Sequence, residues 1–242
     1  MERAVTIDMG DGSASGFLYA EGTTPRRGLL YLTDIGGIRR SMRDAAARIA
    51  AQGYTVLLPN VFHRIGEPPF FTPPLNMSDP EVRAIFGKLM SSLPASAMEQ
   101  DGARYVDFLA AQPETAKQTV VVVGHCMSGA MALRVAAARP DKVAAAASFH
   151  GGRLFTDSPE SPHLLLPRIE SRLYFGHAVK DASMPQEAID KLGEALSQWG
   201  GQYENEVYEG AFHGWTTKDS RVYNEVQAER AFGKLMELLA RS

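Results

Sequence analysis

The sequence predicts an α/β fold with a mostly parallel central sheet and helices on both of its faces. Short apolar runs bounded by Gly, Pro or polar residues have the pattern of buried parallel strands. Segments with helical periodicity lie between these runs, and such alternation with short connections is typical of a parallel sheet covered on both faces. We expect strands at 29–32, 55–58, 120–123, 144–149, 172–175 and 206–208, and helices at 42–52, 81–91, 98–111, 130–138, 186–199 and 223–239.

Two segments stand apart from this alternation. Alternating residues at 4–9 and 17–20, joined through a Gly-Asp-Gly turn, indicate a hairpin at one edge of the sheet. Residues 62–95 contain a Pro- and aromatic-rich stretch without periodicity, followed by a helical segment. We therefore expect a single α/β domain over residues 1–242, with a lid or pocket-lining segment at 62–95; an ordinary packed helix is the alternative there.

Composition and charge favour a small-molecule partner. Of the 242 residues, 45% are hydrophobic and 22% charged, which is enough to bury a core. The net charge of -3 comes without a basic stripe, so neither nucleic acid nor a membrane surface is expected as a partner. Because no signal-like start and no run of membrane-spanning length is present, we expect a cytoplasmic protein. We expect it to be a monomer or a homodimer.

Cys126 is the only cysteine in the chain. An intrachain disulfide and a multi-cysteine zinc site are therefore excluded. The histidines show no metal-ligand spacing, and we expect neither a metal nor another cofactor. A lone cysteine is either a small buried residue or a nucleophile.

The strand at 120–123 runs into a helix through Gly124-His125-Cys126-Met127-Ser128, which has the spacing small-x-nucleophile-x-small. A nucleophile on such a turn has a strained backbone, and only small residues two positions away on either side leave room for it. The N-terminus of the following helix favours a thiolate and an oxyanion. The pattern predicts Cys126 as a nucleophile, with a buried structural cysteine as the alternative.

Two later strand ends supply an acid and a base. Asp181 follows the strand at 172–175, although aspartate is also common at turns and helix starts. His213 follows the strand at 206–208. A cysteine nucleophile needs a base, the base needs an orienting acid, and the chain order nucleophile, acid, base is that of α/β-hydrolases. We therefore predict an α/β-hydrolase fold with Cys126, Asp181 and His213 as catalytic residues.

These residues resemble the dienelactone hydrolase family, also called carboxymethylenebutenolidases, and the similarity covers nearly the whole chain. A cysteine in a Gly-aromatic-Cys-x-Gly-Gly context is typical of the family, and here the elbow reads Gly-His-Cys-Met-Ser-Gly at 124–129. Further matches are Phe-His-Gly-Gly at 149–152, the acid loop at 176–185 and Tyr-Glu-Gly-Ala-Phe-His-Gly at 208–214. The resemblance implies hydrolysis of a lactone or a small ester without a cofactor.

The resemblance also implies roles for residues around the nucleophile. Asp34 takes the place of a family glutamate that holds the resting thiol and helps to form the thiolate, but its side chain is one methylene shorter. A plain loop aspartate that caps the following helix is the alternative. The backbone N–H groups of Ile35 and Met127 are expected to form the oxyanion hole.

Substrate contacts are expected from three further residues. Arg83 resembles a family arginine that clamps the carboxylate of the substrate, and a solvated surface arginine is the alternative. His150 and Trp215 are expected at the substrate pocket. Gly87 and Thr217 stand where the family has a tyrosine and an arginine, and these departures argue against dienelactone itself as the substrate.

The expected reaction is acyl transfer to Cys126, with His213 as general acid and base and Asp181 as its orienting acid. The shortened Asp34 and the altered substrate residues leave a second hypothesis open, a small-molecule binding or regulatory module without turnover. A third hypothesis keeps the thiol chemistry but changes the reaction, for example to an isomerisation.

Overall fold

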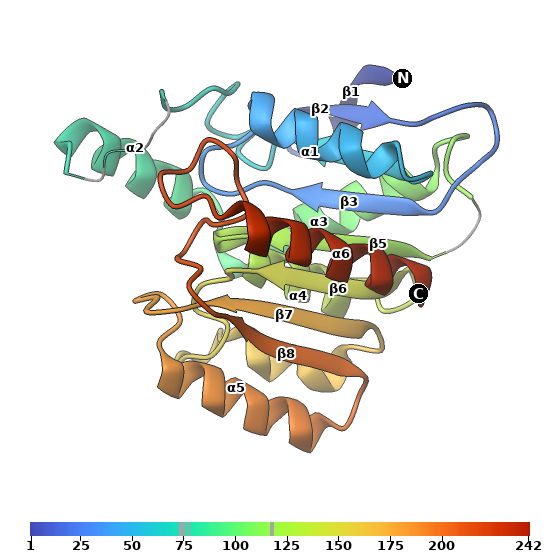
Figure 1. Ribbon diagram of the computed structural model, residues 1–242. Coiled ribbons are helices and arrows are strands. Elements are labelled where there is room, and N and C mark those ends of the chain that lie inside the picture. Colours follow the sequence, from blue (N-terminus) through green and yellow to red (C-terminus); the bar gives the residue numbers. More distant parts are fainter. Residues whose placement is uncertain (73–75, 77, 117–118) are drawn as a thin grey trace.

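A computed structural model describes residues 1–72, 76, 78–116 and 119–242, and it contains one eight-stranded sheet in the order β1-β2-β4-β3-β5-β6-β7-β8 (Figure 1). From β3 and β4 to β8 all neighbouring strands are parallel, which confirms the predicted mostly parallel sheet. The strands are β1 (Glu2–Asp8), β2 (Ser13–Tyr19), β3 (Gly28–Leu32), β4 (Thr55–Pro59), β5 (Val120–His125), β6 (Val143–Phe149), β7 (Arg172–Ala178) and β8 (Tyr203–Tyr208). The helices are α1 (Arg40–Ala50), α2 (Pro80–Ser91), α3 (Ala95–Ala110), α4 (Met127–Ala138), α5 (Gln186–Trp199), α6 (Glu225–Ala240) and the 3-10 helix η1 (Pro162–Arg168).

The predicted hairpin forms one edge of the sheet. β1 pairs antiparallel with β2, and β2 pairs antiparallel with β4. The later strands are parallel because each of them returns to the sheet after a helical crossover. The sequence did not indicate η1, which lies between β6 and β7.

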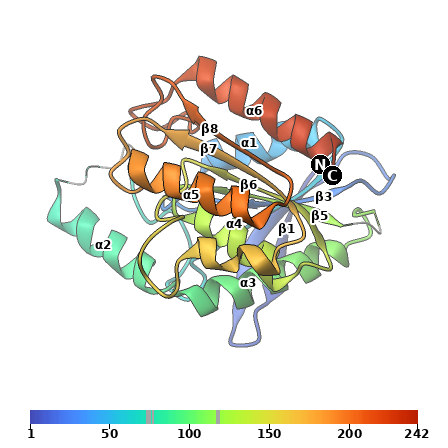
Figure 2. The same ribbon diagram turned by 90° about the horizontal axis from the view of Figure 1, so that it is seen from below.

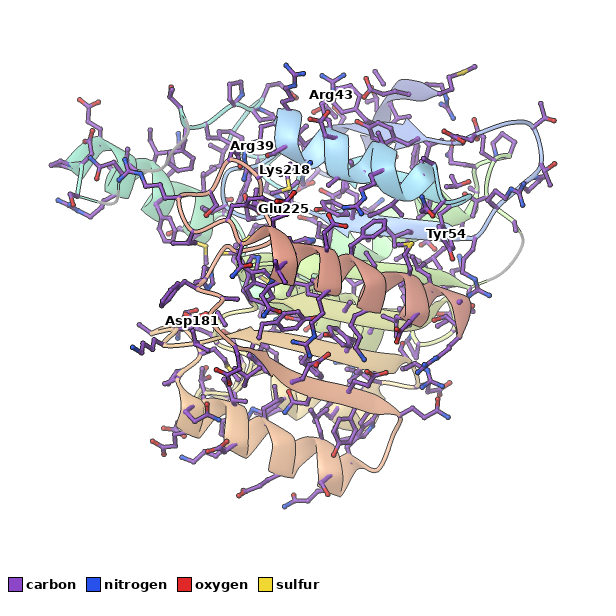
Figure 3. All side chains as sticks on the ribbon, in the orientation of Figure 1. Arg39, Arg43, Tyr54, Asp181, Lys218 and Glu225 are labelled. Carbon is purple, nitrogen blue, oxygen red and sulfur yellow. The ribbon has the colours of Figure 1, made fainter. Side chains whose placement is uncertain are left out.

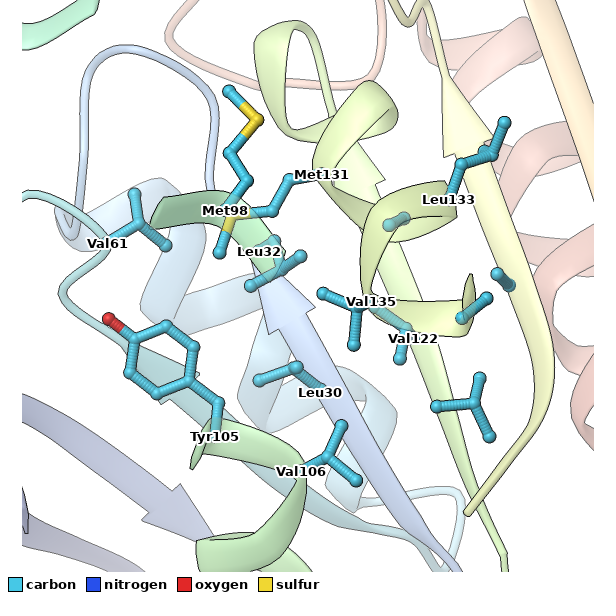
Figure 4. Close-up of a cluster of buried hydrophobic side chains, with 14 of the residues drawn as sticks. Leu30, Leu32, Val61, Met98, Tyr105, Val106, Val122, Met131, Leu133 and Val135 are labelled. Atoms are coloured by element: carbon cyan, nitrogen blue, oxygen red, sulfur yellow. The ribbon is translucent and has the colours of Figure 1, made fainter. Parts of the chain in front are cut away.

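Two layers of helices cover the sheet, because successive residues of a strand point to opposite faces. Leu30 and Val122 belong to the core on the side of α3, α4 and α5, whereas Leu29 belongs to the core on the side of α1 and α6. Figures 1 and 2 show α1 and α6 together on one side of the sheet. Figure 4 shows the other layer, where Leu30 and Val122 lie near Tyr105 of α3 and Val135 of α4. Each such buried aliphatic side chain stabilises the fold by about 1.5–3 kcal/mol.

The segment 62–95 leaves the body of the domain between β4 and α3. Helix α2 begins with Pro80, and the carboxylate of the preceding Asp79 caps it by accepting the N–H of Glu81. The helix projects at the periphery of the domain in two views (Figures 1 and 2). Leu89 is its only fully buried residue. Residues 73–75 and 77 of this segment lie outside the described residues, and its role as a lid stays a prediction. No helix within the described ranges is long and apolar enough to cross a bilayer.

The carboxyl ends of the parallel strands meet at one edge of the sheet, which is where ligands bind in open α/β folds. The loops after β3, β5, β6, β7 and β8 all begin at this edge. Figure 3 labels Arg39 and Asp181 there, on the side to which the arrow of β3 points in Figure 1.

Candidate active site

Cys126 lies between β5 and α4 on a strained backbone, as the elbow pattern predicts. Its φ of 56° and ψ of -125° lie in a region that residues with a Cβ rarely adopt. Gly124 has to be a glycine, because a Cβ there would lie 1.9 Å from the carbonyl oxygen of Ser128. The tight turn leaves Cys126 half-buried in the wall of a cavity at the carboxyl edge of the sheet.

Side chains from three strand ends form a line at this cavity. His213 Nε2 lies 3.1 Å from Cys126 Sγ, and His213 Nδ1 lies 2.6 Å from Asp181 Oδ2. Ser183 holds the other carboxylate oxygen of Asp181, because its N–H and its hydroxyl donate to Oδ1 at 2.8 and 2.7 Å. The structure thus brings the predicted nucleophile, base and acid to the distances that a catalytic triad requires.

His213 is positively charged in this arrangement. Burial by itself would lower its pKa, but hydrogen bonds to Asp181 and Cys126 outweigh burial and raise the pKa of His213 to about 10. Burial likewise opposes ionisation of Asp181, yet the contact with His213 keeps the pKa of this carboxyl below its usual value. At neutral pH His213 therefore carries a proton on both ring nitrogens and can donate the one on Nε2.

Two backbone N–H groups border the same cavity. Met127 is the first residue of α4, so its N–H has no acceptor inside the helix and lies at the positive end of the helix dipole. In the loop after β3, Asp34 accepts the N–H groups of Gly36 and Gly37 at 2.9 and 3.0 Å and leaves that of Ile35 unused. Within the described part of the chain, neither Met127 N–H nor Ile35 N–H has a protein acceptor. Both residues line the cavity, so both N–H groups are available to a ligand.

The carboxylate of Asp34 is paired with Arg39. Two guanidinium nitrogens of Arg39 donate to the two oxygens of Asp34 at 2.7 and 2.8 Å, and the third donates to Asp219 at 2.7 Å. The contact with the resting thiol that the resemblance implies is not made, since Sγ has its hydrogen bond with His213. The guanidinium of Arg39 bonds both carboxylates, Asp34 and Asp219. It thereby joins the loop after β3 to the loop that follows His213.

His150 lies directly behind the nucleophile and also borders the cavity. Its Nδ1 accepts the N–H of Cys126 at 3.1 Å, and its Nε2 lies 2.8 Å from the hydroxyl of Thr216. The rings of His150 and His213 meet edge to face with 5.1 Å between their centroids. Burial, followed by the charge of His213, holds the pKa of His150 well below its usual value, so His150 is neutral.

The cavity has a volume of about 1070 Å³. This is at the upper end of the range of about 300–1,000 Å³ that is common for small-molecule sites. A simple lactone ring would therefore fill only part of it. One part of the wall is apolar and consists of Phe71, Phe86, Met90, Ala95, Met98 and Ala130. Another part is polar and includes Arg134, Arg153, Thr156, Ser158, Glu160 and Ser161.

Arg83 does not reach this cavity. It lies exposed on α2 one turn before Phe86, and one of its guanidinium nitrogens donates to the carbonyl oxygen of Ser78 at 2.8 Å. Helix α2 projects from the domain in both views (Figures 1 and 2), and it is the later part of the helix, with Phe86 and Met90, that lines the cavity.

Trp215 is fully buried and is not part of the cavity wall. Its ring stacks on Tyr208 at 4.8 Å and meets His150 edge to face at 5.0 Å. Gly214, with a φ of 102°, turns the chain inward directly after His213. Trp215 therefore supports His150 from behind, and the predicted contact with the substrate is corrected to a packing contact.

The sequence did not single out Ser183 or Thr216, although both are bonded to site residues. The Asp-x-Ser spacing at 181–183 is a turn signal that could have indicated Ser183. No local pattern indicates Thr216, because its partners come from other strand ends. No group of three or more His, Cys, Asp or Glu side chains in the described ranges could hold a metal ion.

Comparison with known proteins shows the family of the chain. A model of the dienelactone hydrolase family matches residues 15–242. The chain belongs to the dienelactone hydrolase family. A carboxymethylenebutenolidase of Rhodococcus opacus is 30% identical over 189 residues, which are 76% of this chain and 68% of the relative. As a member of the dienelactone hydrolase family, the chain is a hydrolase that acts on ester or lactone bonds.

Solved structures confirm the predicted α/β-hydrolase fold. A Klebsiella pneumoniae protein superposes with a TM-score of 0.86 over 100% of both chains at 20% identity. A dienelactone hydrolase-like promiscuous phosphotriesterase from metagenomic libraries superposes with a TM-score of 0.81 at 20% identity, covering 100% of this chain and 98% of that chain. At this level of identity the likeness shows the fold alone.

Proposed function

We propose that this protein hydrolyses an ester or a lactone through an acyl-enzyme on Cys126. The observation that carries the proposal is the line of Cys126 Sγ, His213 and Asp181, with separations of 3.1 and 2.6 Å. Two unused N–H groups, those of Met127 and Ile35, border the same cavity. A nucleophile, a protonated histidine and an oxyanion site are together the requirements of acyl transfer.

In the first half-reaction the thiolate of Cys126 attacks the carbonyl carbon. A C–S bond forms, and the negative charge that develops on the carbonyl oxygen is bound by the N–H groups of Met127 and Ile35. When this intermediate collapses, the C–O bond to the leaving group breaks, and His213 transfers its Nε2 proton to the leaving alkoxide. With a lactone the alcohol stays tethered to the acyl group.

In the second half-reaction His213 is neutral and accepts a proton from water. The resulting hydroxide attacks the thioester carbonyl, the C–S bond breaks, and the acid leaves with the thiolate and the imidazolium restored. Asp181 keeps the imidazole in the required tautomer and stabilises the imidazolium. Substrate, water and the side chains of this protein supply every atom of both steps.

The apolar wall favours substrates with an apolar group larger than a simple lactone ring. Each methylene that moves from water into such a wall is worth about 0.8 kcal/mol, which corresponds to a rise in kcat/KM of up to about 4-fold. The proposed partner is therefore a small-molecule ester or lactone with an apolar acyl chain. The cytoplasmic location expected from the sequence stays a prediction.

The proposal is tested first with the nucleophile and the base. Hydrolysis of p-nitrophenyl esters and simple lactones is compared between the wild type, Cys126→Ala and His213→Ala, with the exposed Asp190→Asn of α5 as the matched surface control. We expect both site variants to lose turnover by about 10³-fold or more and the control to match the wild type. Wild-type turnover by Cys126→Ala would contradict the proposal.

The chain-length preference is tested with a p-nitrophenyl series from acetate to octanoate. Phe86 lines the cavity, whereas its neighbour Ile85 on α2 is 37% exposed and does not. Phe86→Ala should flatten the rise of kcat/KM with chain length, and Ile85→Ala should preserve it. A wild-type series that falls steadily from acetate onwards would show that the apolar wall does not hold the acyl chain.

A further inference from the structure

A chain of hydrogen bonds runs behind the nucleophile, and the proposed reaction does not use it. It begins at the backbone N–H of Cys126, which is shared between the carbonyl oxygen of Phe149 and His150 Nδ1, each at 3.1 Å. His150 Nε2 lies 2.8 Å from Thr216 Oγ1, and the same hydroxyl lies 3.1 Å from His125 Nδ1. His125 directly precedes Cys126, so the chain closes a ring around the nucleophile elbow.

The protons of this chain can be arranged in one direction only. A backbone N–H can only donate, so His150 Nδ1 has to be an unprotonated acceptor and the proton of this neutral ring sits on Nε2. His150 Nε2–H then donates to Thr216, which leaves the threonine hydroxyl to donate to His125 Nδ1. His125 in turn carries its proton on Nε2, which has no acceptor among the described protein atoms.

The surroundings keep both histidines of the chain neutral. His150 and His125 are buried, and burial lowers the pKa of His125 to about 4 and that of His150 well below its usual value. The charged groups that face His150 are His213 and, through it, Asp181; those near His125 are Asp34 and Arg39. A proton on His150 Nδ1 would confront the N–H of Cys126 and break the chain.

Two strained residues meet at the first bond of the chain. Cys126 has a φ of 56° and His150 a φ of 42°, and such conformations persist only where the surroundings enforce them. His150 also carries the edge-to-face contact with the ring of His213. One neutral imidazole therefore contacts the backbone of the nucleophile and the ring of the base at once.

We propose that His150 is a positioning residue, held in its Nε2-protonated tautomer by Thr216 and His125, that fixes the backbone of Cys126 and the ring of His213 for attack. The inference rests on the proposed function, because it needs Cys126 and His213 to react. It assigns to His150 no proton transfer of its own. Thr216, which is remote from Sγ along this chain, accepts the Nε2 proton of His150 and so stabilises the tautomer whose Nδ1 accepts the Cys126 N–H.

The kinetic test compares two substitutions of Thr216. Thr216→Val keeps the shape but removes the hydroxyl, which leaves the Nε2 proton of His150 without its acceptor and the ring without this anchor, whereas Thr216→Ser keeps the hydroxyl. With a p-nitrophenyl ester we expect Thr216→Val to lower kcat by about 10- to 100-fold with little change in KM, and Thr216→Ser to stay within about 3-fold of the wild type. Equal kcat values for the two variants would overturn the inference.

A second measurement needs neither turnover nor a folded variant. Long-range proton–nitrogen NMR spectra of the wild type report which ring nitrogen of each of the six histidines carries a proton. We expect the Nε2–H tautomer for His150 and His125 at neutral pH, and a proton on His150 Nδ1 would overturn the inference.

The kinetic results separate the two proposals. If Cys126→Ala abolishes turnover but Thr216→Val does not lower it, only the positioning role fails. If Cys126→Ala keeps turnover, the proposed function fails, and the positioning role fails with it.

Discussion

Replacing Asp181 with asparagine removes one charge from the site and little else. The carboxylate oxygen that faces His213 Nδ1 at 2.6 Å becomes part of a neutral amide of nearly the same shape. In the wild type the pKa of His213 rises from 6.5 to about 10 against the opposing effect of burial, a net preference for the imidazolium on the order of 5 kcal/mol at about 1.4 kcal/mol per pKa unit. Without the carboxylate, the pKa of His213 should fall, because only the contact with Cys126 then opposes the effect of burial. We expect kcat/KM to fall by about 10³- to 10⁴-fold.

The assay combines ester hydrolysis with an NMR titration of the His213 ring, and Asp190→Asn on the exposed side of α5 is the matched control. Asp190 accepts a hydrogen bond from Gln186, so the control also loses one carboxylate contact. The reasoning is refuted if Asp181→Asn keeps kcat/KM within about 3-fold of the wild type, or if its His213 pKa does not move.

Three further outcomes follow from the structure. Gly124→Ala should prevent folding or lower the free energy of unfolding in urea by about 3 kcal/mol or more, because its Cβ would lie 1.9 Å from a backbone oxygen. Gly233→Ala in α6, where a Cβ meets no atom within 4 Å, should raise the free energy of unfolding by about 0.5–1 kcal/mol. Equal effects of the two substitutions would contradict the steric argument. The folded-state pKa of His213 is raised from 6.5 to about 10, so its contribution to stability is complete below pH 6.5 and is lost as the pH rises through about 10; urea midpoints should show this decline in the wild type and not in His213→Gln. Arg39→Met leaves Asp34 without its bidentate partner and should cost about 1–3 kcal/mol with a lower kcat/KM, and unchanged values of both would show that the pair is dispensable.

The parts of the fold and site that the sequence could predict follow from local rules. The strand before Cys126 is a run of valines, and the small residues around the elbow are required by sterics that act over two positions, so both can be read without a structure. Asp181 and His213 each follow a strand, and parallel strands bring their carboxyl ends to one edge of the sheet. The proximity of the three side chains is therefore a consequence of topology.

The residues that sequence analysis misplaced depend on distances that no local pattern contains. Arg83 lies in a helix, as expected, but the projection of α2 from the domain is a tertiary property. Trp215 turns into the core because Gly214 reverses the chain, and Asp34 is held by Arg39, whose other partner comes from the distant loop after β8. Packing between remote segments decides such contacts, and periodicity does not report it.

The central claim is that substrate carbon becomes bonded to Cys126, and intact-mass spectrometry tests it most directly. A slowly hydrolysed ester is mixed with the wild type and with Cys126→Ala, and the reaction is quenched in acid. The intact masses of the proteins are then measured, and the modified residue is identified by peptide mapping. Because the chain contains one cysteine, an adduct on that thiol has a single possible position. We predict one acyl group on the peptide that contains Cys126 in the wild type and none in the variant. Turnover by the wild type without any adduct, together with equal turnover by Cys126→Ala, would contradict the account.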